Sequence, residues 1–250
     1  MLPPLPLRDR LLLKVQRLVS HLSFPLVWAA ATSWLVLGRR LTLADAPGLR
    51  RRFAELVAAE RGPVVVCANH LTLVDSAILG WALATLPSSM RHFRRMPWSV
   101  PEKTNFAHTL GWRLAMFVAK CVYVTRGGPR EEVRRTLAKI AYLLRAGDLV
   151  CIFPEGGRSR TGRVDTEGFA YGVGQVVQEV PEASVLCVYL RGRDQQGFSD
   201  VPAKGDEYRV ELEMFRPATA SAGLRGARDL ATQIVHRLAA MEERHFAARR

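Results

Sequence analysis

A histidine and an aspartate five positions apart are the strongest candidates for chemistry in this sequence. His70 and Asp75 stand in the run NHLTLVD, directly after a short apolar stretch. A carboxylate that accepts a hydrogen bond from one imidazole nitrogen leaves the other nitrogen free to act as a general base. A five-residue offset on one helix would put the two side chains on different faces. They can meet only if a turn separates them and Asp75 opens a helix, where Asp is a favourable N-cap. The alternative is a capping aspartate beside an unrelated loop histidine.

A second candidate site is the run FPEGGRS at residues 153–159. Gly156 and Gly157 would let backbone amides approach a ligand closely, and Arg158 supplies charge that matches a phosphate. Glu155 suits phosphate poorly, but it could bind hydroxyl groups of an acceptor or hold the arginines. A tight turn with solvated arginines is the alternative.

These runs follow short apolar segments that are typical of buried strands. Strands are predicted at residues 63–68, 121–125, 149–153, 184–190 and 208–215, and helices at 75–86, 129–145, 168–180 and 224–250. Alternating strands and helices predict an α/β fold with a mixed, mostly parallel sheet flanked by helices. Sites in such folds gather where strands end, so the loops that carry His70, Arg126 and Glu155 are expected to lie together.

The N-terminal part of the chain has a different composition. Residues 18–37 are about as long as a bilayer span and contain no Lys, Arg, Asp or Glu. Pro25 and several polar residues favour a kinked or re-entrant anchor in one leaflet over a spanning helix, with Trp28 and Trp34 at headgroup level. A cleaved signal peptide or a buried helix of a soluble protein would also fit this stretch.

We therefore expect an N-terminal membrane-associated helical segment at residues 1–46 and an α/β domain at residues 47–250. Basic residues flank the apolar segment on both sides: Arg8, Arg10, Lys14 and Arg17 precede it, and Arg39, Arg40, Arg50, Arg51 and Arg52 follow it.

The chain is strongly basic, with 36 Lys and Arg residues against 23 acids and a formal net charge of +13. Such a charge suits an anionic partner, either a membrane surface or a nucleic acid. The basic residues flank an apolar anchor and polar loops and do not alternate with aromatic residues, so a membrane is expected and a nucleic acid is not.

The sequence lacks the motifs of several other enzyme classes. It has no G-x-S-x-G elbow and no G-x-x-x-x-G-K-[ST] loop, which argues against a serine hydrolase and a P-loop enzyme. Four cysteines without C-x-x-C spacing, and histidines without ligand spacing, predict no metal site. Four reduced, packed thiols would suit the cytosolic side of a membrane.

Taken together, the polar runs resemble the conserved blocks of the glycerolipid acyltransferase family, whose best-known members acylate lysophosphatidic acid (1-acylglycerol-3-phosphate). NHLTLVD resembles the catalytic H-x4-D block, with His70 as the base and Asp75 as its orienting partner. The segment from Glu102-Lys103 to Val124-Thr125-Arg126 resembles the second block, and FPEGGRS resembles the third, usually FPEGTRS. The resemblance implies these substrate-binding residues: Lys103, Arg126, Glu155, Gly156, Gly157, Arg158 and Ser159.

The same resemblance implies an O-acyltransferase on the cytoplasmic side of the inner membrane. It would move a fatty acyl group from acyl-CoA or acyl carrier protein, as co-substrate, to a hydroxyl of a lysolipid, without a cofactor or metal. Gly157 stands where the family usually has Thr, and Cys187 lies in a strand where a Pro is expected. The acceptor therefore stays open between lysophosphatidic acid and another lysophospholipid or lyso-aminolipid. A thioesterase of the same fold and a non-catalytic lipid-binding protein are the competing hypotheses.

Overall fold

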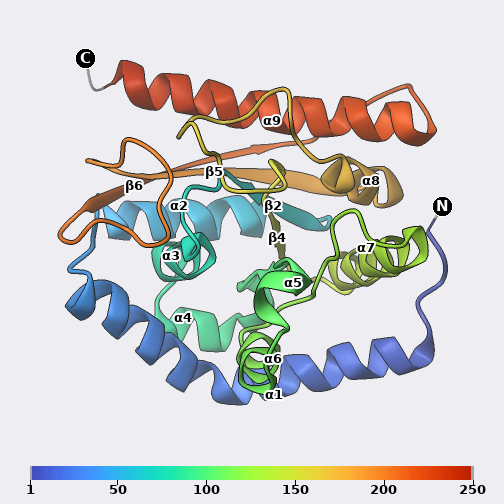
Figure 1. The fold of residues 1–250 in the computed structure, drawn as a ribbon, viewed down its shortest axis with the longest axis horizontal. Coiled ribbons are helices and arrows are strands. Elements are labelled where there is room, and N and C mark those ends of the chain that lie inside the picture. Colours follow the sequence, from blue (N-terminus) through green and yellow to red (C-terminus); the bar gives the residue numbers. More distant parts are fainter. Residues whose placement is uncertain (1, 249–250) are drawn as a thin grey trace.

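A sheet of six strands forms the centre of the computed structural model, which describes residues 2–248 (Figure 1). The strand order is β1-β6-β5-β2-β4-β3, and every neighbouring pair is parallel except β5 and β6. The strands are β1 (Thr42–Leu43), β2 (Val64–Ala68), β3 (Trp98–Ser99), β4 (Val150–Ile152), β5 (Ser184–Gly192) and β6 (Glu207–Phe215). The predicted α/β class with a mixed, mostly parallel sheet is confirmed.

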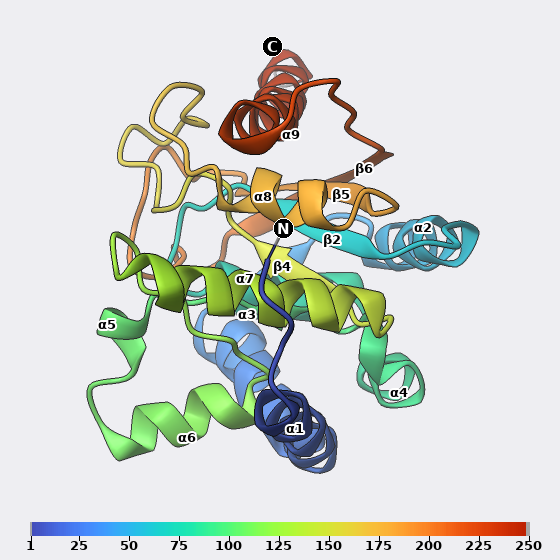
Figure 2. The same ribbon diagram turned by 90° about the vertical axis from the view of Figure 1, so that its right-hand side faces the viewer.

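Helices cover both faces of this sheet (Figures 1 and 2). They are α1 (Leu7–Ser33), α2 (Ala46–Ala59), α3 (Asp75–Leu83), α4 (Leu86–Arg91), α5 (Lys103–Phe106), α6 (Leu110–Val118), α7 (Arg130–Arg145), α8 (Gly172–Glu179) and α9 (Gly223–Ala247). Two shorter helical turns are η1 (Trp34–Gly38) and η2 (Phe93–Arg95). Residues 249–250, the end of the last predicted helix, lie outside the described part of the chain.

The central strands have apolar side chains on both faces. Val65 and Cys67 of β2 pack with α7, α8 and α9 in one core cluster, whereas Val64, Val66 and Ala68 pack with α2 and α3 in another. All residues of β2 and β5 are buried. A parallel strand covered on both sides needs a continuous apolar run, and the sequence provides one.

The predicted strand at residues 121–125 is wrong. This segment forms only two isolated bridges, Ser99 with Cys121 and Glu102 with Val124. Backbone bonds link it to both sides of Pro101, since Val122 N–H donates to Ser99 O (2.9 Å) and Lys103 N–H donates to Val124 O (2.8 Å). Pro101 has no N–H to donate between them, so the ladder is interrupted. The edge strand is instead the shorter β3.

Two predicted helix boundaries also differ from the structure. The helix predicted at residues 75–86 ends at Leu83, and Thr85 caps a new helix with Pro87 in its first turn. The helix predicted at residues 168–180 begins only at Gly172. Both are boundary errors, and the elements themselves are present.

The N-terminal helix α1 bends part-way along its length (Figure 1) and contains Pro25, which cannot make the usual i→i−4 bond. With η1 it is long and apolar enough to cross a membrane, and 11% of its most apolar window is buried. It is therefore a candidate membrane anchor and does not fit the alternative of a buried core helix. In both views α1 and α6 lie together, on the side of the molecule opposite α9 (Figures 1 and 2).

Candidate active site

His70 and Asp75 meet directly after β2. The His70 Nδ1 and Asp75 Oδ2 atoms are 2.9 Å apart. The turn between them forms because Asp75 also accepts bonds from the backbone N–H groups of Leu71 (2.6 Å) and Thr72 (2.8 Å) and from the Thr72 hydroxyl (2.6 Å). With Nδ1 donating to the carboxylate, Nε2 carries the free lone pair of a general base.

The position of Asp75 in the helix differs from the prediction. Asp75 is the first residue of α3, and Val74 holds the N-cap position without a side-chain bond. The carboxylate nevertheless lies at the helix N-terminus, where the helix dipole favours a negative charge. The Asp75 side chain is buried, with 1% of the residue exposed. Its charge is balanced by hydrogen bonds from the backbone amides of Leu71 and Thr72 as well as by the imidazole.

The main chain of His70 is held from both sides by the FPEGGRS loop. His70 N–H donates to Glu155 Oε1 (3.0 Å), and Ser159 N–H donates to His70 O (2.9 Å). The His70 ring stacks on Phe153, with ring centroids 4.2 Å apart. The two polar loops therefore form one unit, as their positions at neighbouring strand ends predict.

Glu155 has a supporting place in this unit. Its second oxygen, Oε2, accepts from Asp165 N–H (3.3 Å). Burial raises the pKa of Glu155 to about 7, although both backbone hydrogen bonds act in the opposite direction. The prediction had this carboxylate bind an acceptor or hold arginines; the structure places it against the backbone of His70.

Two residues of the site were not predicted from the sequence. Asn69 bridges the ends of two strands, because its side-chain amide donates to Leu190 O (3.0 Å) and its side-chain oxygen accepts from Leu190 N–H (2.8 Å). Thr72 bonds Asp75 through its hydroxyl. The sequence signal for both is a polar side chain among the apolar residues that flank His70.

A cavity of about 1030 Å³ opens beside His70. It is at the upper limit of small-molecule pockets, and large enough for lipid chains. Arginines from three positions form what we term the cationic rim: Arg126, Arg158 and Arg160. Apolar residues from α1 and α6 form what we term the apolar wall: Phe24, Val27, Trp28, Ala31, Trp112 and Met116. Trp28, expected at headgroup level, lies in this wall.

Acidic residues hold two of the three guanidinium groups of the rim. Arg126 Nε lies 3.3 Å from Glu102 Oε2, and Arg158 pairs with Asp200. Arg158 and Arg160 both lie over the ring of Phe198, at 5.2 and 5.7 Å from its centroid. Arg126 remains half-exposed, so it can still reach a ligand in the cavity.

Four of the predicted substrate-binding residues do not line the cavity. Lys103 lies on the surface and pairs with Glu132, its Nζ 2.8 Å from Oε1. Glu155 and Ser159 support the backbone of His70. Gly156 has φ +71°, and a Cβ there would lie 3.0 Å from the side chain of Ala170, so its role is to allow a tight turn. Gly157 does line the cavity, with Arg126 and Arg158.

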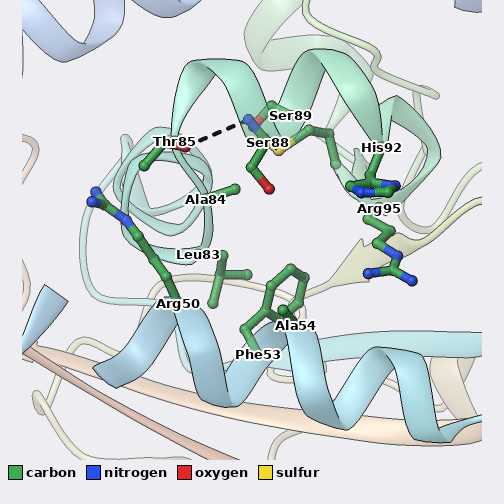
Figure 3. A pocket seen from close by; sticks show the side chains of 11 residues that line it. Arg50, Phe53, Ala54, Leu83, Ala84, Thr85, Ser88, Ser89, His92 and Arg95 are labelled. Atoms are coloured by element: carbon green, nitrogen blue, oxygen red, sulfur yellow. Dashed lines mark hydrogen bonds between the residues drawn. The ribbon is translucent and has the colours of Figure 1, made fainter. Parts of the chain in front are cut away.

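A second cavity, of about 80 Å³, lies between α2, α3 and α4 (Figure 3). Arg50 extends from α2 along it and donates to the carbonyl groups of Trp81 and Ala82 at the end of α3. This cavity has room for a few water molecules and contains no residue of the His70 loop. It is not part of the candidate active site.

Comparison with known proteins identifies the family to which the chain belongs. No curated protein matches the chain. The sequence model of the family described as "Acyltransferase" matches residues 50–202, more than half of the 250 residues. The matched span contains His70, Asp75, the FPEGGRS loop and the cationic rim. The chain therefore belongs to the acyltransferase family, that of the glycerolipid acyltransferases related to lysophosphatidic acid acyltransferase.

Proposed function

We propose that the protein is a membrane-bound O-acyltransferase that transfers a fatty acyl group from acyl-CoA or acyl carrier protein to a hydroxyl of a lysolipid. The observation that carries this proposal is the His70–Asp75 pair on a cavity of about 1030 Å³ with a cationic rim and an apolar wall. A lysolipid and a fatty acyl thioester each combine an apolar chain with a polar group, and this cavity offers surfaces for both.

The reaction is a direct transfer. His70 Nε2 takes the proton of the acceptor hydroxyl while the hydroxyl oxygen attacks the thioester carbonyl carbon. Asp75 stabilises the imidazolium that forms. The tetrahedral oxyanion then collapses, the carbon–sulfur bond breaks, and the departing thiolate receives the proton from His70. General-base assistance of this kind accelerates a reaction by about 10²- to 10⁴-fold, and positioning of the two substrates contributes further.

The cationic rim favours an acceptor that carries a phosphate. Arginine binds phosphate oxygens through charge-assisted, often bidentate hydrogen bonds. Arg126 and Arg158 face the cavity, and their acidic partners Glu102 and Asp200 hold them there. We therefore propose 1-acylglycerol-3-phosphate or a related lysophospholipid as the acceptor, bound chiefly by Arg126, Arg158 and the backbone at Gly157.

Exposed apolar side chains on α1 and α6, the two helices that form the apolar wall, support membrane binding. On α1 they are Leu7, Leu11, Leu12, Val15, Leu18, Leu22 and Leu26, and on α6 they are Leu110, Trp112 and Leu114. No residue of α6 is buried. A contiguous surface of this kind is unusual in water but suits the interface of one bilayer leaflet. Lipid substrates could then enter the cavity from the leaflet.

We place the enzyme on the cytoplasmic side of the inner membrane. All four cysteines are free thiols, as expected in a reducing compartment. The excess of basic residues would attract anionic lipids, at about 1 kcal/mol for each Lys or Arg near the surface. In this arrangement residues 1–46 serve as the membrane segment and residues 47–250 as the catalytic domain.

The test is thiol release from a long-chain acyl-CoA, and from acyl carrier protein, by the purified protein in detergent. It is run with and without a panel of lysolipids, beside His70→Ala. Release that needs one acceptor and is lost in the variant supports the transferase and identifies its substrate. Release without any acceptor would favour a thioesterase instead. No release from either donor with any acceptor would favour a lipid-binding protein.

A further inference from the structure

The segment that follows FPEGGRS is held by the C-terminal helix. Glu242 of α9 is 3% exposed and accepts bonds from Arg163 Nε (2.8 Å) and from Val164 N–H (3.1 Å). Its other oxygen accepts from the Tyr189 hydroxyl (3.2 Å) and from Arg191 (3.4 Å). A buried carboxylate of α9 that binds four donors from two other parts of the chain fixes all three parts relative to one another.

The two arginines around Glu242 make this arrangement specific. Arg191 is 1% exposed and donates to the carbonyl of Gly162. Arg163 and Arg191 both lie over the ring of Phe246, at 4.5 and 4.9 Å from its centroid. Within residues 2–248, Glu242 is the acid that pairs with Arg191, and its removal would leave this buried guanidinium without that partner, which is costly. The geometry of residues 162–164 therefore depends on Glu242.

Two short paths lead from this segment to the backbone of His70. In the first, Arg163 O accepts from the Ser159 hydroxyl, and Ser159 N–H donates to His70 O (2.9 Å). In the second, Asp165, next to Val164, donates its N–H to Glu155 Oε2 (3.3 Å). The other oxygen of Glu155 accepts from His70 N–H (3.0 Å).

We infer that Glu242 is a positioning residue for the candidate general base: it fixes residues 159–165, and these hold the backbone of His70 on both sides. Glu242 lies outside residues 50–202, the span that the family model matches. The catalytic part of the inference depends on the proposed transfer reaction. A displacement of about 1 Å in an active site can lower the rate about 10²-fold, so small shifts of this segment should affect turnover.

The experiment compares Glu242→Ala and Glu242→Gln with Glu243→Gln. Glu243 pairs with the same Arg163 but is 70% exposed, so its variant is a matched control. We expect Glu242→Ala to lower kcat by about 10- to 100-fold, with a smaller change in KM for the lysolipid, because the base is displaced while Arg126 of the cationic rim lies outside residues 159–165 and keeps its partner Glu102. Glu242→Gln keeps an acceptor oxygen and should restore part of kcat. Thermal melts establish that each variant is folded at the assay temperature.

Amide hydrogen exchange on the same variants tests the coupling without the need for turnover. Glu242→Ala and, to a smaller extent, Glu242→Gln should speed exchange in residues 159–165 and at the His70 amide, whereas Glu243→Gln should not. Unchanged exchange at His70, or an unchanged kcat in a folded Glu242→Ala, would overturn the inference. If the wild type transferred no acyl group to any acceptor, the proposed function would fail, and the exchange measurement would still decide whether Glu242 positions His70.

Discussion

The cavity has two sides that are built in different ways. Around His70 the polar groups are buried and have specific partners, as in the contacts of Asp75 and Glu155 with nearby backbone amides. The apolar wall instead comes from α1 and α6, whose outer side chains are exposed. A few polar contacts fix α1, among them Gln16 with the Cys121 carbonyl (2.9 Å) and Arg17 with Asp148 (2.6 Å). The geometry around His70 therefore depends on individual hydrogen bonds, whereas the apolar wall depends on the apolar character of the side chains on α1 and α6.

The comparison predicts the largest effect at the polar side. His70→Ala removes the general base and should lower the acceptor-dependent release of thiol by about 10²- to 10⁴-fold. The melting temperature should change little, because the buried Asp75 carboxylate keeps its bonds from Leu71 and Thr72 when the imidazole is removed. The same change at the exposed His236 of α9 is the control. Equal activity of the two variants would show that the polar side does not carry the chemistry.

A pH-dependent stability effect should follow from Glu155. Its folded-state pKa of about 7 is above the usual 4.5, so the folded state binds this proton more tightly than the unfolded state. Relative to Glu155→Gln, the wild type should therefore lose stability as the pH rises from 4.5 to 7. The difference between their unfolding free energies should change by up to about 3 kcal/mol over this range.

Denaturant unfolding at several pH values measures that difference. Glu167→Gln, at an exposed position in the same loop, serves as the control and should give a curve parallel to that of the wild type. A Glu155→Gln curve that also runs parallel would mean that the carboxylate is not held as the buried contacts indicate.

Two neighbouring cations should differ in their effect on acceptor binding. Arg126 faces the cavity, whereas Lys103 pairs with Glu132 on the surface. Arg126→Ala should raise KM for a phosphate-bearing lysolipid by about 10- to 100-fold, since hydrogen bonds to charged groups contribute about 1.5–3 kcal/mol. Lys103→Ala should change KM by less than about 3-fold, as expected for a surface ion pair. Steady-state kinetics with varied acceptor concentration measure both KM values. A larger rise in KM for Lys103→Ala than for Arg126→Ala would show that Lys103, and not Arg126, binds the phosphate.

The smallest effect is expected for single changes on the apolar surface. Leu114→Glu on α6 should weaken binding to vesicles of anionic phospholipid by about 10-fold, because a leucine buried only in part at the membrane interface contributes at or below the lower end of the range of about 1.5–3 kcal/mol for full burial. Leu224→Glu is the matched control, since Leu224 is 73% exposed on α9, on the opposite side of the molecule. Vesicle sedimentation measures the binding of both variants. An equal loss of vesicle binding in the two variants would indicate a general effect of the added negative charge and not a role of the α6 surface.

The site could be predicted from the sequence where its contacts are local. His70 and Asp75 are five residues apart, and the turn between them is closed by the neighbouring amides of Leu71 and Thr72. The role of Glu155 could not be predicted in the same way, because its bond to His70 joins residues 85 positions apart. The surface position of Lys103 likewise depends on Glu132, a residue of a different helix.

The same distinction holds for the fold. Buried strands such as β2 and β5 could be predicted from the sequence because their apolar runs are continuous. The segment 121–125 has a similar run, but its pairing is set by Pro101, twenty residues earlier. The helix α1 begins at Leu7, well before the uncharged stretch, because charged residues of its first half pair with the domain: Asp9 with Arg135 (2.6 Å) and Arg17 with Asp148. Such partners are visible only in three dimensions.

The contribution of α1 to the cavity has a consequence for how such enzymes could be recombined. Phe24, Val27, Trp28 and Ala31 face the cavity, yet they precede residue 50, where the family match begins. A chimera with residues 1–45 from a homologue and the rest from this chain would keep His70 and Asp75. Its apolar wall, however, would contain the side chains of the homologue's N-terminal helix. Exchange of one terminal segment could thus change which lipids the enzyme accepts, without any substitution at its reactive centre.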